Sequence, residues 1–348
     1  MPDLRYAAYR AGLEALYFSG AHYAFRALFS GVGVILTLHH VRPASDEPFH
    51  PNGILEISPQ FLDRMIVHLR DRKFDLVSID EVRRRLVERD FSRRFVALTF
   101  DDGYRDNLEH ALPVLRRHEV PFALYIATSF PDRLGELWWV ALERVVAKTD
   151  RLVIEIDGKN RFFDCVGASR KRSAFHEVYW WLRTIPDEES FRRTVRDICA
   201  RYGVDVMAPG RELCMDWAEI AHMAEDPLCT IGAHTVSHCF LTKVTERVVR
   251  SEMQRSAEVI EASLGKRPEH FAYPYGDNSR REFAIAAELG FKTAVTTRPA
   301  VLVRGHRDHL TSLPRISVNG NFQAIRYLDV LISGVPFLLH RQAREAAA

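Results

Sequence analysis

Short apolar runs alternate along the chain with longer stretches in which apolar residues recur every three to four positions. Such runs are typical of buried strands, and such stretches of the helices that cover them. Strands are expected at residues 33–38, 76–78, 95–100, 122–127, 229–233, 270–273, 291–296 and 313–318. Helices are expected at 59–70, 81–88, 108–118, 216–225, 246–264 and 281–289, with Ser58 and Asp80 as N-caps of the first two. Seven to eight parallel strands separated by helices predict an α/β fold, a distorted (β/α) barrel.

Two regions interrupt this alternation. Residues 1–32 predict an N-terminal helical segment, with a helix over 6–30 packed on the barrel. Residues 131–210 predict an inserted α+β subdomain with a hairpin (152–156 and 161–163) and two helices (171–184 and 190–202). Trp138 and Trp139 are expected in the core of this insertion, with a sugar-stacking platform as the alternative. The barrel domain then comprises 33–130 and 211–330, followed by a C-terminal tail, 331–348, with a frayed Ala-rich end.

Composition narrows the class of protein. The chain has 348 residues, of which 47% are hydrophobic, enough for one large core. A net charge of +2 gives no reason to expect nucleic acid as a partner. The odd set of five cysteines shows no paired spacing, which favours reduced thiols in a cytoplasmic setting: Cys165, Cys199, Cys214, Cys229 and Cys239. The sequence does not indicate an oligomeric state.

The first thirty residues do not resemble a signal peptide, because they lack a basic start, a continuous apolar centre and a cleavage site. Charged residues such as Arg10 and Glu14 also exclude a membrane span there. We therefore expect a cytoplasmic protein. The many aromatic residues leave a membrane-peripheral helix at a bilayer interface as an alternative to packing on the barrel.

Candidate chemistry lies at the ends of two predicted strands. Asp101 and Asp102 directly follow strand 95–100, and burying two bare carboxylates side by side costs several kcal/mol unless water or a cation neutralises them. His234 and His238 follow strand 229–233 and, four residues apart, can present two ring nitrogens to one ion. Taken alone, the Asp pair also fits an ordinary strand-to-helix turn. Cys239 is a conceivable fourth ligand, although a small buried hydrophobe is the favoured role.

Placement supports the metal interpretation. Seven polar residues fall at or just past the carboxyl ends of predicted strands, the face that holds the chemistry in such barrels: His39, His40, Asp101, Asp102, His234, Tyr275 and Arg315. One carboxylate oxygen and two imidazoles suit Zn²⁺, with Co²⁺ or Ni²⁺ as alternatives. Such an ion lowers the pKa of water towards neutrality, and Asp101 is then placed to accept a proton.

Two of these stretches resemble motifs of the polysaccharide deacetylases, the NodB homology fold of carbohydrate esterase family four. Thr99-Phe100-Asp101-Asp102-Gly103 matches the first motif, and His234-Thr235-Val236-Ser237-His238 matches the second, H-[S/T]-x-x-H. The resemblance covers roughly residues 33–128 and 211–318. It implies Asp101 as catalytic base, Asp102, His234 and His238 as metal ligands, and an N-acetylated glycan as substrate.

The third family motif, R-x-P-Y, is only partly present. Ala272-Tyr273-Pro274-Tyr275 resembles it, which gives the backbone N–H of Tyr275 the role of oxyanion donor. Ala272 replaces the arginine that in the family holds the base aspartate. Arg315, on the last strand, is expected to reach Asp101 from across the barrel, with a surface salt bridge as the alternative.

The remaining motifs are missing. No tryptophan follows Trp217 to complete the fourth motif, and the closing strand has no L-x-H to supply the acid that protonates the leaving amine. His40 is the candidate acid, with His39 or His309 as alternatives; strand alternation allows only one of His39 and His40 to point inward.

The sequence thus predicts a metal-dependent hydrolase that removes N-acetyl groups from an amino-sugar-containing poly- or oligosaccharide or a lipid-linked precursor. An O-deacetylase would use the same residues. A glycan-binding barrel with degenerate catalysis is the alternative from another class, and acetate release would separate the two. A Mg²⁺ phosphatase is disfavoured, since it would need D-x-D and histidines are poor Mg²⁺ ligands.

Overall fold

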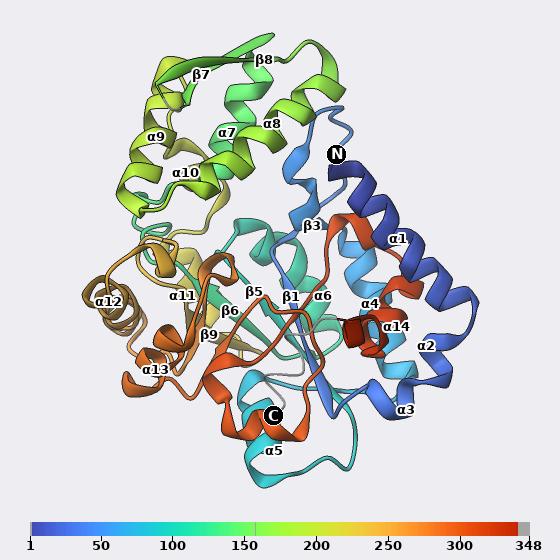
Figure 1. The fold of residues 1–348 in the computed structure, drawn as a ribbon. Helices are drawn as coiled ribbons and strands as arrows, with labels where there is room; N and C mark the ends of the chain where they lie inside the picture. Colours follow the sequence, from blue (N-terminus) through green and yellow to red (C-terminus); the bar gives the residue numbers. More distant parts are fainter. Residues whose placement is uncertain (1, 157, 340–348) are drawn as a thin grey trace.

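The computed structural model describes residues 2–156 and 158–339 (Figure 1). Within that part of the chain, eight strands form one parallel sheet: β1 (Gly33–Leu38), β4 (Asp75–Leu76), β5 (Phe95–Phe100), β6 (Phe122–Ile126), β9 (Cys229–Ala233), β10 (His270–Ala272), β11 (Thr293–Val295) and β12 (Ile316–Ser317). Their order is β11-β10-β9-β6-β5-β1-β12, with β4 paired to β5. A parallel bridge from Val295 to Leu313 brings β11 to the segment just ahead of β12. The prediction of a distorted (β/α) barrel is confirmed.

The strands are short but nearly all buried, which is why each appears in the sequence as an apolar run. All residues of β1, β5 and β6 are buried, as expected for parallel strands covered on both faces. Leu38 and Phe100 are register partners at the carboxyl ends of β1 and β5. The residues that follow these two strands therefore emerge side by side.

Helices cover the barrel close to the predicted places: α4 (Pro59–Asp71), α5 (Ile79–Glu88), α6 (Leu112–Arg117), α11 (Trp217–Ala224), α12 (Glu246–Leu264) and α13 (Arg280–Glu288). Ser58 caps α4, as expected, by accepting the Phe61 N–H. The expected Asp80 cap of α5 is wrong. Ser78 takes that position, because its hydroxyl accepts the Glu81 N–H at 3.1 Å, and Asp80 lies inside the first turn.

The insertion forms its own layer beyond the carboxyl ends of the barrel strands (Figure 1). It contains α7 (Trp138–Lys148), the antiparallel hairpin β7 (Arg151–Ile156) and β8 (Lys159–Asp164), α8 (Gly167–Thr184), α9 (Glu188–Arg201) and α10 (Ala208–Leu213). Asp157, in the expected hairpin turn, lies outside the described residues. Trp138 and Trp139 are buried in a hydrophobic cluster of this layer, so the predicted core role is confirmed.

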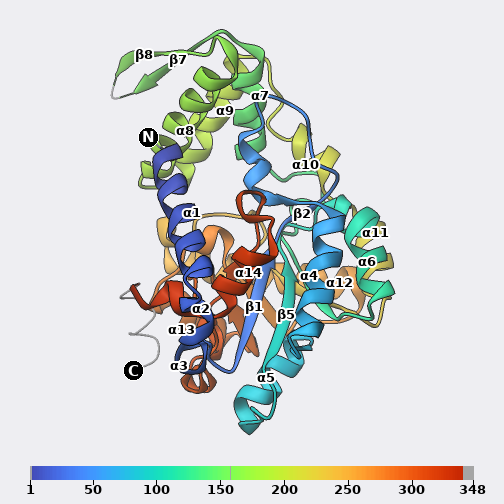
Figure 2. The same ribbon diagram turned by 90° about the vertical axis from the view of Figure 1, so that its right-hand side faces the viewer.

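The N-terminal segment consists of three helices, and the expectation of one helix over 6–30 is wrong: α1 (Pro2–Phe18), α2 (Ala21–Ala24) and α3 (Arg26–Phe29). Gly20 ends the first helix because it adopts a left-handed conformation, φ 71°. The three helices lie along one side of the molecule (Figure 2). Part of this segment packs as expected, since Arg10 Nε donates to the Tyr327 hydroxyl at 2.8 Å on α14 (Ile325–Ile332).

The last described residues are packed rather than extended. α14 crosses the expected boundary at 330, and a 3₁₀ turn (Val335–Leu339) follows it, with Phe337 buried. The Ala-rich end, 340–348, lies outside the described residues. All five cysteines are free thiols, as expected. No helix in the described residues has both the length and the apolar character needed to cross a membrane.

Candidate active site

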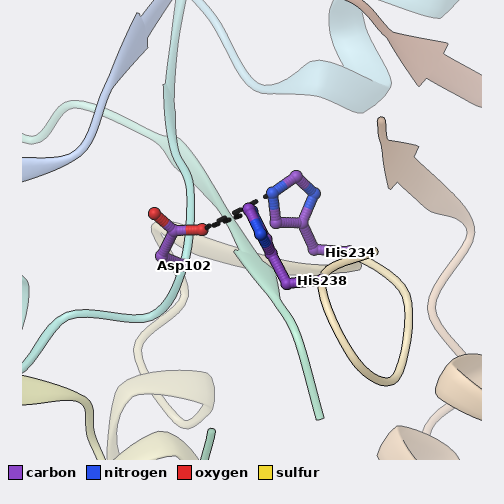
Figure 3. A group of neighbouring side chains, drawn as sticks. All are labelled: Asp102, His234 and His238. Carbon is purple, nitrogen blue, oxygen red and sulfur yellow. Dashed lines mark ion pairs between the residues drawn. The ribbon is translucent and has the colours of Figure 1, made fainter. Parts of the chain in front are cut away.

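Three side chains named from the sequence converge above the barrel (Figure 3). The Nε2 atoms of His238 and His234 lie 3.1 and 3.6 Å from Asp102 Oδ1. One potential ligand atom from each residue lies within 4.8 Å of the other two, and all three side chains are buried. Cys239, the conceivable fourth ligand, is buried but is not part of this group. Cys239 is instead part of the hydrophobic core, the favoured prediction for this residue.

Backbone strain is concentrated at this site. Asp102, Thr235, His238 and Tyr275 are four of the eight described non-glycine residues with positive φ, at 73°, 66°, 53° and 58°. Such conformations cost about 1–3 kcal/mol each and persist only where neighbours enforce them. The Thr235 hydroxyl accepts the His238 N–H at 2.9 Å, and Glu252 of α12 accepts two further N–H groups of the same loop. The loop after β9 is thus held in the shape that presents both imidazoles.

The protonation states suit a divalent cation. His234 Nδ1 lies 2.7 Å from the Ala272 carbonyl, so this nitrogen donates and Nε2 keeps its lone pair for the site. Burial lowers the pKa of His234 to about 4, which keeps the imidazole neutral. Burial raises the pKa of Asp102, but the His238 imidazole outweighs it and holds that pKa well below its usual value. Two imidazole nitrogens and one carboxylate oxygen are the donor set of Zn²⁺-type sites.

Asp102 Oδ1 supplies an independent observation. The atom is buried and, among the described residues, has no hydrogen bond of acceptable geometry, although both imidazoles face it. A buried carboxylate oxygen left without a donor is costly. The residues present therefore fit a cation shared by these three side chains.

Asp101 is held by Arg315 from across the barrel. The guanidinium makes a paired contact, Nη1 to Oδ1 at 2.7 Å and Nη2 to Oδ2 at 2.6 Å. Arg315 is fully buried, and its remaining donors reach the Thr296 carbonyl and the Thr99 hydroxyl. The contact between Arg315 and Asp101 that the sequence predicts is present. The alternative, a surface salt bridge for Arg315, is wrong. Burial raises the pKa of Asp101, but the Arg315 charge outweighs it and keeps that pKa low.

A cleft of about 1150 Å³ opens above Asp101, Asp102 and the two histidines, between the barrel and the insertion. Tyr275 lines it, and its ring lies edge-on to His238 with centroids 4.4 Å apart. The Tyr275 hydroxyl accepts a hydrogen bond from Trp138 Nε1 at 2.8 Å, so the insertion fixes this side chain. Aromatic side chains from α1, α7 and α8 form further parts of the wall: Tyr6, Tyr9, Trp139, Phe175, Tyr179 and Trp180.

The structure places the three candidate acids differently from the sequence expectation. His39 lines the cleft together with both aspartates, whereas His40 and His309 are not among the lining residues. His40 is buried beneath Tyr104, with its Nδ1 2.5 Å from Asp106 Oδ2. His309 is exposed, at the end of a 3₁₀ turn. Strand alternation did leave one histidine facing inward, but it is His39.

Sequence reasoning missed a second titratable cluster in the cleft wall. His50 Nδ1 lies 3.1 Å from Glu143, and its Nε2 lies 2.7 Å from Glu56, which also contacts Arg42. These hydrogen bonds, with Glu143 first, raise the pKa of His50 to about 9, so a cationic imidazole lies on the wall near neutral pH. His50 comes from a loop without periodic pattern, and its partners are distant in sequence, so no local signal marks it.

These features define a (β/α) barrel with a candidate divalent-metal site at the carboxyl ends of its strands. A family model described as polysaccharide deacetylase matches residues 88–151 and 185–294, half of the chain. The chain belongs to the polysaccharide deacetylase family.

Similar proteins agree with this placement. Chitin deacetylase 2 of Cryptococcus neoformans is 36% identical over 81 residues, which is 23% of this chain and 18% of that protein. Chitin deacetylase 1 of the same species is 39% identical over 67 residues, 19% of this chain and 14% of that protein. The chain thus spans less than a fifth of the length of the curated relatives it matches.

Solved structures resemble the whole barrel at low identity. The Streptococcus pyogenes deacetylase PplD, in complex with acetate, aligns with 86% of this chain and 97% of its own, at a TM-score of 0.58 and 19% identity. IcaB from Ammonifex degensii aligns with 87% of this chain and 96% of its own, at a TM-score of 0.53 and 20% identity. These likenesses show the fold.

Proposed function

We propose that this protein is a metal-dependent hydrolase that removes N-acetyl groups from an amino-sugar-containing poly- or oligosaccharide, or from a lipid-linked precursor of one. One observation carries the proposal. Asp101, held by Arg315, opens into the same cleft as the Asp102, His234 and His238 group. A barrel that only binds glycan has no use for an anchored carboxylate beside a metal site. Family membership supports the substrate class.

Asp102, His234 and His238 would hold the cation, with Zn²⁺ favoured and Co²⁺ or Ni²⁺ as alternatives. When bound, this ion supplies Lewis-acid chemistry at the acetamide carbonyl and makes water more acidic. Asp101 accepts a proton from the attacking water, and the water oxygen bonds to the carbonyl carbon. Arg315 orients Asp101 through both carboxylate oxygens and keeps it ionised. The Tyr275 N–H is the donor that stabilises negative charge on the carbonyl oxygen.

His39 is the residue we assign to the leaving group in place of His40. Of the two neighbouring histidines it is the one that lines the cleft with both aspartates, and it is not in the ligand group. Burial lowers the pKa of His39, so its protonated ring is a ready acid. When the C–N bond breaks, His39 gives a proton to the departing amine, and the proton that Asp101 took from water balances it, so that the products are acetate and a free amino sugar.

The cleft supports an extended substrate. At about 1150 Å³ it exceeds the usual range of pockets for small ligands, roughly 300–1,000 Å³. Aromatic side chains of α8 face it, including Tyr179 and the exposed Trp180. Flat rings on a cleft wall suit the apolar faces of sugar rings. The insertion would thus contribute to glycan binding.

The proposal is tested by acetate release from N-acetylglucosamine oligomers. Metal-free protein prepared by dialysis against a chelator is reconstituted with Zn²⁺, Co²⁺, Ni²⁺ or Mg²⁺. We expect equal amounts of acetate and free amine with one or more of the first three ions, and at least a roughly hundredfold loss without metal. Binding of the oligomers without acetate release under any of these conditions would favour the glycan-binding alternative. Release from O-acetylated xylan alone would identify an O-deacetylase.

A pair of variants separates the roles of the two neighbouring histidines. We expect His39→Gln to lower kcat about 10²-fold, at unchanged thermal stability, because the amine must leave without an acid. His40→Gln should instead cost about 1–3 kcal/mol of unfolding free energy, since the Asp106 carboxylate loses its buried partner. Steady-state kinetics and urea unfolding measure both. The reverse outcome, with turnover lost only in His40→Gln, would return the acid role to His40.

A further inference from the structure

The N-terminal helices carry an unusual share of the exposed apolar surface. Six of the twelve exposed large hydrophobic side chains in the described residues lie between positions 6 and 28: Tyr6, Tyr9, Phe18, Tyr23, Phe25 and Leu28. Phe18 and Leu28 are 76% and 75% exposed. Single exposed hydrophobic residues are common, but a cluster of them marks an interaction surface.

This surface is joined to the rest of the molecule through main-chain contacts. The four-residue helices α2 and α3 have no buried residues among their side chains. Their anchoring comes from the main chain: Arg94 donates to the Ser30 carbonyl at 2.6 Å, and Gly334 fits so closely that a Cβ on it would lie 2.0 Å from the Phe29 oxygen. Leu28 stays 75% exposed, and Phe25, whose ring lies 6.5 Å from that of Phe29, stays 49% exposed.

A basic hollow of about 410 Å³ adjoins these residues. Its lining includes Arg26, Arg72, Lys73, Arg93 and Arg94, against a single carboxylate, Asp329. That carboxylate is engaged already, by His68 Nε2 at 2.7 Å and Arg72 at 3.0 Å. The hollow thus carries an excess of positive charge directly beside the apolar cluster.

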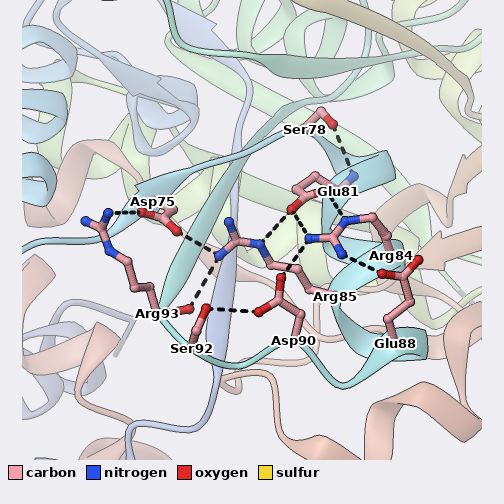
Figure 4. A network of polar contacts seen from close by, with 9 residues as sticks. All are labelled: Asp75, Ser78, Glu81, Arg84, Arg85, Glu88, Asp90, Ser92 and Arg93. Carbon is pink, nitrogen blue, oxygen red and sulfur yellow. Dashed lines mark hydrogen bonds and ion pairs between the residues drawn. The ribbon is translucent and has the colours of Figure 1, made fainter.

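Three of these cations lack an anionic partner. Within the described residues, Arg26, Lys73 and Arg94 form no ion pair. Arg26 lies 4.0 Å above the Tyr23 ring, and Arg94 donates to the Ser30 and Ile332 carbonyls. Arginines on the neighbouring α5 differ, because Arg84 contacts Glu81, Glu88 and Asp90 (Figure 4). Of the unpaired cations of the hollow, Arg26 belongs to α3 itself.

We propose that α1–α3 and the basic hollow form a docking surface for a bilayer that contains anionic lipids. Aromatic and leucine side chains enter the interface between headgroups and acyl chains, and Arg26 and Lys73 pair with lipid phosphates. A second copy of this chain fits less well, because a twofold contact would place the same cations opposite each other. The proposal is independent of the proposed catalytic activity, since no residue tested below lies in the cleft.

The docking surface and the cleft are connected by α1, so membrane docking would also position the cleft. α1 carries Tyr6 and Tyr9 at the cleft and leads to Phe18 and α2 (Figure 2). Tyr6 and Phe18 are twelve residues apart, roughly 18 Å along the helix. A docked molecule would hold its cleft close to glycans at the membrane surface.

Vesicle sedimentation of the full chain tests the proposal. We expect the protein to bind vesicles of phosphatidylcholine and phosphatidylglycerol about tenfold more tightly than phosphatidylcholine alone, with the difference suppressed by high salt. The triple variant Phe18→Ser/Phe25→Ser/Leu28→Ser should lose binding to both vesicles at least about tenfold. Arg26→Gln/Lys73→Gln should lose only the preference for phosphatidylglycerol.

Matched controls keep the test specific. Val87→Ser/Leu134→Ser/Val166→Ser removes three exposed apolar side chains elsewhere, and Arg84→Gln removes a cation that is already paired. Both controls should bind vesicles as the wild type does, and circular dichroism should show all variants folded. Two results would overturn the proposal: no binding to either vesicle, or a wild-type dimer in light scattering that becomes monomeric in the triple variant.

Discussion

Replacing Asp101 by asparagine should lower the turnover of N-acetylated oligosaccharides by about 10²–10⁴-fold while leaving the metal content unchanged. This range is the usual contribution of a positioned general base. The asparagine side chain keeps the size of the aspartate but cannot accept a proton. The proposed ligand atoms remain in place, since they come from Asp102, His234 and His238 rather than from the carboxylate that Arg315 holds. We expect KM to change little, because Asp101 acts on water rather than on the sugar.

The measurement combines acetate release with elemental analysis of the same samples. Asp226→Asn is the matched control: it changes another buried aspartate, paired with Arg116 at 2.5 Å, outside the cleft. That variant should retain wild-type kcat. If Asp101→Asn loses its metal together with its activity, Asp101 contributes to holding the ion. If its kcat is unchanged, the proposed base is wrong.

The site could be predicted from the sequence because parallel strands deliver their carboxyl ends to one face of the barrel. Asp102 and His238 are 136 positions apart, yet each follows a strand of the sheet, and the runs 95–100 and 229–233 mark both strand ends. The same reasoning placed Arg315 opposite Asp101 despite the missing motif arginine. Ala272, at the position of that arginine, contributes only its carbonyl, which fixes the His234 ring.

Features set by distant partners could not be predicted in this way. Which of His39 and His40 faces the cleft depends on Asp106, which lies 66 positions from His40 in the sequence and hydrogen-bonds to its ring. The cap of α5 depends on the φ and ψ of Ser78, since both Ser78 and Asp80 are residue types that cap helices. Apolar residues continue across Gly20, so their spacing gives no warning that α1 ends there.

Removing the Arg315 guanidinium should produce the largest loss of stability. In Arg315→Met the Asp101 carboxylate stays buried, 3% exposed, and loses both of its charged hydrogen bonds. Breaking a buried ion pair by removing one partner costs about 3–5 kcal/mol, because the remaining charge is left without compensation. Urea unfolding of the metal-free protein measures this cost. Arg250→Met is the control, because its ion pair with Glu288 is exposed on both sides, at 38% and 58%, and its loss should cost no more than about 1 kcal/mol.

A double variant distinguishes the lost charge pair from a simple loss of packing. Adding Asp101→Asn to Arg315→Met removes the uncompensated charge, so we expect the double variant to regain about 2 kcal/mol over Arg315→Met alone. Activity should not return, because the base is absent. If the losses of unfolding free energy in Arg315→Met and Asp101→Asn simply add in the double variant, Arg315 stabilises the barrel through its contacts with Thr99 and Thr296 rather than through Asp101. A recovery of stability without activity would show that Arg315 acts on stability through the charge of Asp101, the proposed base.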